Sequence, residues 1–169
     1  MNVALDMTAR TGVEATDDLK SRYLVSLKLV ERLHRLLLDV IKDEFERLGR
    51  SDVNSVQALL LYNIGDAELT AGELTSRGYY LGSNVSYNLK KLVDAGYINH
   101  QRSTTDRRSV RVKLTQKGQD ICKVVSGLYE RQLKSLQQVG GVATDDLEVL
   151  NKSLIRLERF WTDQIRYQL

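Results

Sequence analysis

Hydrophobic residues recur every three or four positions in the first third of the chain. They are Leu24, Leu27, Val30, Leu33, Leu37, Ile41, Phe45 and Leu48. This spacing predicts one long amphipathic helix that starts at Asp17 or Asp18 and is ended by Gly49. At about 1.5 Å per residue such a helix is about 45 Å long, more than a small core can cover. We therefore expect part of its apolar face to need another partner.

Three shorter helices are predicted in the middle of the chain. The first covers residues 53–64, and a capping box of Thr70 and Glu73 starts the second. After the sequence GYYLG, the third runs from Ser83 to Ala95 and Gly96 ends it. Two short helices joined by a connection that contains glycine form a candidate helix-turn-helix.

A hairpin is predicted next, because the period of the pattern changes to two. Residues 97–102 and 109–114 alternate in polarity, as the strands of a half-buried hairpin do. In the second strand the apolar residues at positions 110, 112 and 114 point to the core, and the basic residues at 111 and 113 point outward. The connecting tip carries Asp106, Arg107 and Arg108 and contains neither Gly nor Pro.

Two helices complete the predicted order of elements. Thr115 caps one that reaches about Gln138, and the pair Gly140-Gly141 ends it. The last helix starts at about Thr144 and carries a narrow apolar seam of the coiled-coil kind. The seam consists of Leu147, Leu150, Leu154, Leu157 and Trp161.

These elements predict a mainly α-helical fold with a small β-hairpin wing. We divide the chain into a flexible N-terminal arm (1–16), an N-terminal dimerisation helix (17–48), a winged helix-turn-helix region (51–118) and C-terminal dimerisation helices (119–169). A second copy would remove the long apolar faces of the end helices from water, which favours a twofold dimer. The alternative is a monomer whose last helix folds back onto the first.

Composition and charge narrow the class of protein. The chain of 169 residues is 42% hydrophobic and 28% charged, which excludes wholesale disorder. No apolar run approaches the roughly 18 residues that span a bilayer, and the N-terminus lacks the apolar core of a signal peptide, so we expect a soluble cytoplasmic protein. The net charge is only +3, but residues 77–118 hold nine basic side chains against two acidic ones. That distribution is typical of a module that binds a polyanion.

The predicted helix at residues 83–95 has one face suited to DNA. A helical wheel places Val85, Leu89, Leu92 and Val93 on the core side. The opposite side carries Ser83, Asn84, Tyr87, Lys90, Lys91 and Asp94. Short polar groups near the start of a helix suit base edges in the major groove, and lysines further along suit phosphates. The alternative is an ordinary solvated face, but the helix-turn-helix context and the basic hairpin favour DNA.

The tip of the hairpin suits the minor groove. A narrow minor groove concentrates negative potential, so Arg107 and Arg108 are candidate contacts beside the duplex. Asp106 cannot favour a phosphate, and we expect it to stiffen the tip through turn hydrogen bonds or a pair with a nearby arginine. The alternative is a solvated loop whose charges prevent aggregation of strand edges.

The order of elements and three motifs resemble one family. The sequence NVSYNLKKLVDAGYI, the tip DRRSVRVKLT and the QKG that follows are similar to the MarR family of bacterial winged-helix transcription regulators. The resemblance covers residues 17–169 in architecture, with its specific motifs between Ser83 and Gly118. It implies a homodimer that binds a pseudo-palindromic site on double-stranded DNA. Such proteins are commonly repressors released by a small phenolic or other lipophilic effector.

The resemblance also implies roles for individual residues. By matching position, Ser83, Asn84, Ser86 and Tyr87 read the major groove, while Arg107 and Arg108 contact the minor groove. Tyr87 stands where the family often has a basic residue, and Asn88 where it often has an aliphatic one. The complete predicted set of DNA contacts also includes Lys90, Lys91, Arg102, Thr104 and Asp106. His34 and Tyr62 are the candidates for the effector site.

The sequence offers little for catalysis. It contains no GxSxG, HExxH, GxGxxG or P-loop motif, so we predict that it is not an enzyme. His34 and His100 are too few to suggest a metal site, and no cofactor is predicted. Cys122 is interpreted as a small buried hydrophobe, with redox sensing as the alternative. The rival function is a winged-helix module for protein contacts, whose binding would lack the steep salt dependence of phosphate neutralisation.

Overall fold

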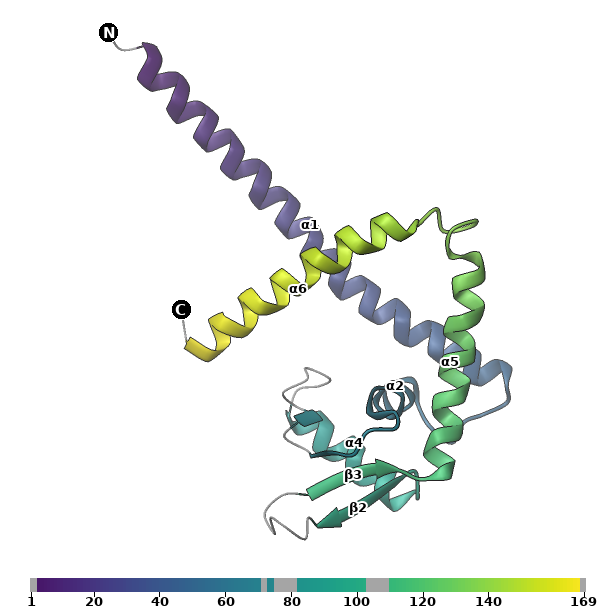
Figure 1. Cartoon of the computed structure of the whole chain (residues 1–169). Helices are drawn as coiled ribbons and strands as arrows, with labels where there is room; N and C mark the ends of the chain where they lie inside the picture. Colours follow the sequence, from purple (N-terminus) through teal and green to yellow (C-terminus); the bar gives the residue numbers. More distant parts are fainter. Residues whose placement is uncertain (1–2, 71–72, 75–81, 103–109, 168–169) are drawn as a thin grey trace. The chain divides into compact units, whose positions relative to one another are not determined.

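The fold is mainly helical with one small antiparallel sheet, as predicted (Figure 1). The computed structural model describes residues 3–70, 73–74, 82–102 and 110–167, without the side chains of 3–15, 82–86, 100–102 and 110. The helices are α1 (Val3–Arg47), α2 (Ser55–Ile64), α4 (Gly82–Asp94), α5 (Gln116–Leu136) and α6 (Thr144–Tyr167). The strands are β1 (Leu69–Thr70), β2 (Ile98–Arg102) and β3 (Val110–Leu114). Two compact units divide the chain at residues 122 and 123, within α5.

The start of α1 differs from the prediction. The helix begins at Val3 and not at Asp17 or Asp18, so the segment assigned to a flexible arm is helical from Val3 onward. The segment contains no proline, and good helix formers such as Ala, Leu, Met, Arg and Glu make up half of it. An aspartate favours a cap but does not prevent a helix from continuing through it, because each added residue gains one backbone hydrogen bond. The predicted end is confirmed, since Gly49 has a φ of 65° and its N–H donates to the carbonyl of Glu46 at 2.9 Å.

Capping boxes fix the starts of the next two helices. Asn54 caps α2, because its side chain accepts from the N–H of Gln57 at 2.9 Å and the Gln57 side chain accepts from the Asn54 N–H at 3.1 Å. The predicted box at Thr70 is confirmed by the same reciprocal pair, at 2.6 Å and 3.1 Å to Glu73. Of that short helix, residues 73 and 74 are described. Both boxes satisfy backbone donors that helix starts leave without partners.

The sheet has the strand order β1-β3-β2, and both pairings are antiparallel. Its register places Ile98 opposite Leu114 and Leu69 opposite Val112. All four of these side chains are buried, whereas the basic side chains at 111 and 113 are exposed, which confirms the predicted faces of the second hairpin strand from position 111 to 114. The side chain of Val110 is not described. The sequence did not predict β1, because two residues are too few to show an alternating pattern.

The core of the first unit lies between this sheet and the helices α2 and α4. Helix α2 contributes Ala58, Leu59, Leu60, Leu61 and Ile64, and α4 contributes Leu89 and Leu92. Helix α1 enters this core only near its end, where Ile41 and Phe45 are buried and α1 packs on α2. The rest of α1 therefore has no comparable cover within the described chain.

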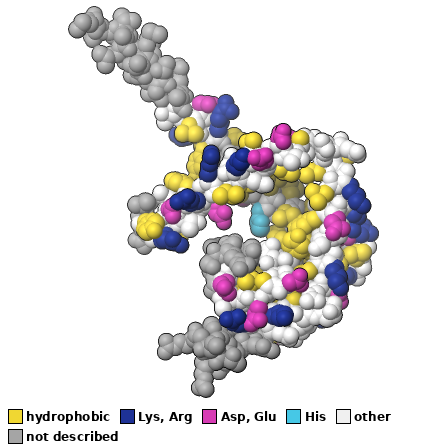
Figure 2. Space-filling view, in the orientation of Figure 1, with side chains coloured by type: hydrophobic (Ala, Val, Ile, Leu, Met, Phe, Trp, Pro, Cys, Tyr) yellow, Lys and Arg dark blue, Asp and Glu magenta, His cyan; other side chains and the backbone are white. Residues whose placement is uncertain are grey.

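Large hydrophobic side chains are exposed along α1 and α6. Those on α1 include Leu19, Leu24, Val25, Leu29, Leu33 and Leu36, and those on α6 include Val149, Leu150, Leu154, Ile155, Phe160 and Ile165. Not one described residue of α6 is buried. Figure 2 shows such hydrophobic side chains at the surface among the charged ones. Despite these apolar faces, the helices among the described residues are not long and apolar enough to cross a membrane.

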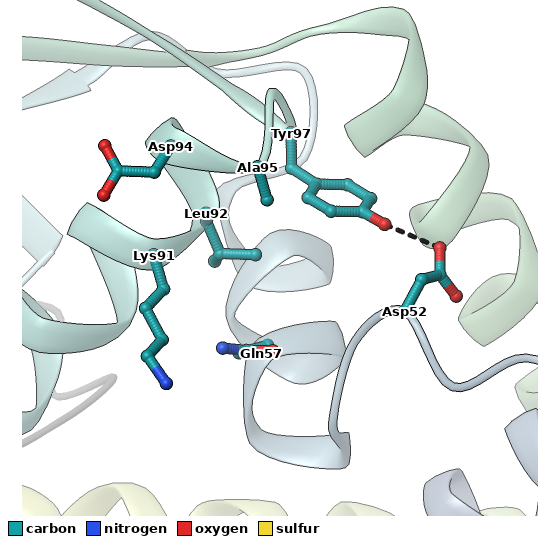
Figure 3. A pocket seen from close by; sticks show the side chains of 7 residues that line it. All are labelled: Asp52, Gln57, Lys91, Leu92, Asp94, Ala95 and Tyr97. Carbon is teal, nitrogen blue, oxygen red and sulfur yellow. Dashed lines mark hydrogen bonds between the residues drawn. The ribbon is translucent and has the colours of Figure 1, made fainter.

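Tyr97, in the connection from α4 to β2, joins several parts of the first unit. Its side chain is only 1% exposed, and its hydroxyl donates to Asp52 Oδ2 at 2.6 Å (Figure 3). Asp52 also accepts two hydrogen bonds from the Arg50 guanidinium, at 3.2 Å and 2.9 Å. The Lys117 ammonium lies 4.1 Å from the centre of the Tyr97 ring. One buried ring thus ties the connection between α1 and α2 to the start of α5.

These contacts shift two pKa values in opposite directions. The Arg50 guanidinium, and then the Tyr97 hydroxyl, hold the pKa of Asp52 well below its ordinary value of 3.8. Burial, and then the hydrogen bond to Asp52, raise the pKa of Tyr97 from 10.0 to about 12. The stabilisation linked to Asp52 is therefore fully present above pH 3.8 and is lost as the pH falls through the lowered pKa. The stabilisation linked to Tyr97 is present below pH 10 and is lost as the pH rises towards about 12.

Replacing Tyr97 by phenylalanine tests this junction, because the change removes the hydroxyl and keeps the ring beneath Lys117. We expect Tyr97→Phe to lower the free energy of unfolding at pH 7 by about 1 kcal/mol, since the lost bond is to a partly exposed carboxylate. Urea denaturation at a fixed protein concentration measures the change. Tyr167→Phe, at an exposed position near the end of α6, is the control and should leave stability unchanged. Equal stability of Tyr97→Phe and wild type from pH 4 to pH 10 would contradict the assignment.

Candidate nucleic-acid interface

Three predicted DNA contacts have described side chains, and all three lie on the exposed face of α4. Tyr87 is 59% exposed, and Lys90 and Lys91 are exposed beside it. On the opposite side Leu89 and Leu92 are buried at 8% and 1% exposure. The predicted division of this helix into a core face and a polar face is confirmed for these residues, while Val93, predicted on the core side, is only half-buried.

The end of α4 is fixed by backbone hydrogen bonds. Gly96 has a φ of 77° and its N–H donates to the carbonyl of Val93 at 2.9 Å. The Tyr97 N–H donates to the carbonyl of Leu92 at 2.8 Å. A left-handed residue at this place turns the chain out of the helix and straight into β2. The polar face of α4 is therefore rigidly attached to the hairpin that follows it.

Within that polar face, Lys91 contacts Tyr87. The ammonium nitrogen of Lys91 lies 4.7 Å from the centre of the Tyr87 ring, a cation–π arrangement between residues one helical turn apart. This contact was not predicted from the sequence, although the spacing of four residues could have indicated it. One of the two neighbouring lysines is thus held over a ring.

The outer face of the sheet is basic but partly neutralised. Arg111 forms an ion pair with Glu68 at 3.5 Å, and both side chains are 47% exposed. Together with Asn99 and Lys113 they line a hollow of about 50 Å³. An exposed pair contributes little stability, but it directs the Arg111 guanidinium along the sheet. Lys113 remains as an exposed positive charge on this face.

The remaining predicted DNA contacts are placed only in part. The backbone of Ser83, Asn84 and Ser86 forms the first half of α4, but their side chains lie outside the described residues. Arg102 ends β2, where it is paired in register with Val110, and its side chain is likewise not described. The tip residues Thr104, Asp106, Arg107 and Arg108 lie outside the described residues altogether.

The two candidates for an effector site lie on different helices. His34 is exposed on α1, and Tyr62 is half-buried on α2. A pocket of about 480 Å³ is lined by other residues, namely Asp52, Gln57, Lys91, Leu92, Asp94, Ala95 and Tyr97 (Figure 3). Asp52 and Gln57 are already engaged by Arg50, Tyr97 and the N-cap of α2. This pocket is polar and does not have the apolar lining of a site for lipophilic molecules.

Cys122 has the surroundings of a packing residue. Its thiol donates to the carbonyl of Leu61 at 3.2 Å. Burial, and then the nearby Asp66 carboxylate, raise its pKa to about 11. Because the thiolate is the reactive form, such a thiol is poorly suited to redox sensing at neutral pH. Within the described residues there is also no cluster of three or more His, Cys, Asp or Glu side chains that could hold a metal ion.

Comparisons with known proteins agree with this geometry. A sequence model of the MarR family matches residues 51–109. The exopolysaccharide II synthesis transcriptional activator ExpG of Rhizobium meliloti is 38% identical over 154 residues, which cover 89% of this chain and 77% of ExpG. The fold is similar to that of Streptococcus pneumoniae FabT in complex with DNA (TM-score 0.61, 23% identity, covering 84% of this chain and 98% of FabT). It is also similar to that of a mutant E. coli MarR complexed with operator DNA (TM-score 0.61, 21% identity, covering 77% and 91%). The chain therefore belongs to the MarR family of transcription regulators and is not an enzyme.

Proposed function

We propose that this protein is a dimeric transcription regulator that binds a pseudo-palindromic DNA site, with α4 in the major groove and the hairpin tip in the minor groove. The observation that carries the proposal is the exposed basic face of α4, rigidly connected to a basic hairpin. Similar folds have been solved in complex with DNA, which supports the same use of this surface.

The proposed contacts divide into two kinds. Ser83, Asn84, Ser86 and Tyr87 face base edges, where hydrogen bonds and apolar contacts discriminate sequence. Lys90 faces phosphates, which position the protein on the duplex without reading its sequence. Arg102 at the end of β2, together with Thr104, Arg107 and Arg108 at the tip, contacts the minor groove and its phosphates. Asp106 stiffens the turn.

Dimerisation is proposed because α1 and α6 leave apolar surface uncovered. Exposed leucines such as Leu33 at 59% and Leu150 at 46% cost free energy in water, at about 25 cal/mol per Å². In a dimer with a twofold axis, each copy would present the same apolar surfaces of α1 and α6, and the partner copy would cover them. A dimer would also present two copies of α4 about one turn of DNA apart, roughly 34 Å, which matches a palindromic site.

The proposal also covers whether the protein activates or represses transcription, and which kind of small molecule modulates its DNA binding. ExpG is named as an activator. We therefore propose that this chain activates at least one promoter, whereas the resemblance to the family alone suggested a repressor. A small phenolic or other lipophilic effector that contacts His34 and Tyr62 would modulate binding.

DNA binding is tested with a duplex selected from a random pool, in which a palindrome is expected. On this duplex and on a random one, Lys90→Ala should weaken binding by a similar factor. It should flatten the slope of log affinity against log salt by about one for each subunit.

Arg107→Ala should instead weaken the binding free energy by about 1–3 kcal/mol on the selected duplex only. Fluorescence anisotropy at several salt concentrations measures both effects, with Lys28→Ala on α1 as the control. A DNA affinity that does not change with salt concentration would instead support a protein-interaction module.

The dimer is tested by placing a charge in the apolar seam of α6. Leu154→Glu should convert the protein from dimer to monomer at micromolar concentration, since a buried carboxylate without a partner costs several kcal/mol. Size-exclusion chromatography with light scattering measures the mass. Arg156→Glu introduces the same residue on the opposite side of α6 and should leave the dimer intact. A wild-type monomer at micromolar concentration would refute the dimer.

The direction of control is tested with a promoter that contains the selected site, fused to a reporter gene. If the protein activates, deleting its gene should lower reporter output several-fold, and restoring the gene should recover it. A rise in output on deletion would show repression at that promoter. Lys90→Ala should give an intermediate output in either case, because it weakens DNA occupancy without abolishing it.

A further inference from the structure

Tyr87 is an unusual residue for its surroundings. Among the described side chains between residues 51 and 132, it is the one large hydrophobic residue that is exposed. The other exposed hydrophobics lie on α1 and directly after it, at the end of α5 and the loop after it, and on α6. Dimerisation through those helices accounts for them but not for Tyr87, which lies at the centre of the polar face of α4. Tyr87 thus lies outside the apolar faces that dimerisation is proposed to cover.

The neighbouring lysines differ in what they contact. The Lys91 ammonium lies 4.7 Å from the centre of the Tyr87 ring, whereas Lys90 projects from the same exposed face without that contact. Side chains on a helix lean towards its N-terminus, so Lys91 reaches back over the turn that carries Tyr87. An ammonium at this distance attracts the face of the ring and so favours the ring orientations that keep the contact. The Tyr87 side chain nevertheless remains 59% exposed.

We propose that Tyr87 is a specificity-determining residue that packs against the 5-methyl group of a thymine, and that Lys91 is the positioning residue that holds the ring for this contact. The proposal rests on the proposed function, in which α4 enters the major groove. A thymine methyl is the one methyl group that the four unmodified bases present there. Among the described side chains of α4, the exposed ring of Tyr87 offers apolar surface for such a methyl, whereas Lys90, Lys91 and Asp94 on the same face are charged.

The contact with Lys91 also reduces the entropy that the Tyr87 ring loses when it packs against a base. A side chain that is free in solution loses rotational freedom when it packs against a ligand. Because Lys91 already limits the positions of Tyr87, less freedom is lost when the ring meets the base. The contact also keeps a positive charge beside the ring, in a groove whose field favours cations. Lys91 therefore contributes to the choice of base, and Lys90 contributes to overall attraction.

Deoxyuridine provides a test that removes the methyl group alone. In the selected duplex each thymine is replaced in turn by deoxyuridine, and the Kd of the full-length protein is measured by anisotropy. For wild type, one position in each half-site should weaken binding by about 4-fold, the effect of one buried methyl group. For Tyr87→Ala, thymine and deoxyuridine at that position should bind equally, while Tyr87→Phe should keep the difference. Because Tyr87 is exposed, Tyr87→Ala should unfold in urea at the wild-type midpoint.

The lysine variants separate positioning from simple attraction. Lys91→Gln should reduce the ratio between the thymine and deoxyuridine duplexes, and Lys91→Arg should restore it, because a guanidinium also stacks on an aromatic ring. Lys90→Gln is the matched control: it removes the same charge one residue away and should weaken both duplexes equally. If only the overall affinity changes in Lys91→Gln, the ring does not depend on Lys91.

The two levels of the proposal fail in different ways. If wild type selects no duplex over random DNA, the proposed function is wrong. If wild type binds a selected duplex tightly but no thymine methyl affects the Kd, or if Tyr87→Ala keeps the full methyl effect, only the role of Tyr87 is refuted.

Discussion

The buried ring of Tyr97 is the contact on which the winged unit depends. Its hydroxyl binds Asp52, its carbonyl accepts from the Thr115 N–H at 3.0 Å, and its ring lies beneath Lys117. The approach at the start of α5 is so close that a Cβ on Gly118 would stand 2.3 Å from this carbonyl, so only glycine fits there. The end of α4 and the start of the hairpin are therefore set by packing from three sides. A rigid junction of this kind lets a recognition helix and a wing approach one duplex in a fixed relation.

Hydrophobic burial is divided unevenly along the chain. The core between the sheet, α2 and α4 is closed, with Leu60, Leu61 and Leu92 at 1% exposure or less. By contrast, α6 has no buried residue in its described length, and α1 is buried only near its end. A small unit can keep such long amphipathic helices only if other apolar surface covers them. The winged core is thus closed by its own contacts, whereas α1 and α6 keep apolar faces uncovered, which is the physical basis of the proposed dimer.

The sequence predicted the elements whose signals are local. The capping box of Thr70 and Glu73, the helix stop at Gly96 and the faces of β3 depend on residues a few positions apart, and all three were confirmed. The start of α1 was wrong because a cap preference at Asp17 is weaker than continued helix propagation. The pair of Asp52 and Tyr97 joins residues 45 positions apart, and no spacing rule indicates such a contact. The DNA contacts at the hairpin tip stay predictions, since that segment lies outside the described residues.

Two lysines with the same charge have different surroundings on the polar face of α4. Lys90 and Lys91 are adjacent in sequence and carry the same charge, so composition alone treats them as equivalent. Their surroundings differ, because only Lys91 lies over the Tyr87 ring. A free ammonium follows phosphates on any sequence, whereas an ammonium held against a ring adds its charge at a fixed place next to an apolar surface. In the proposed interface, substitutions at these two neighbouring residues would therefore change affinity and selectivity separately.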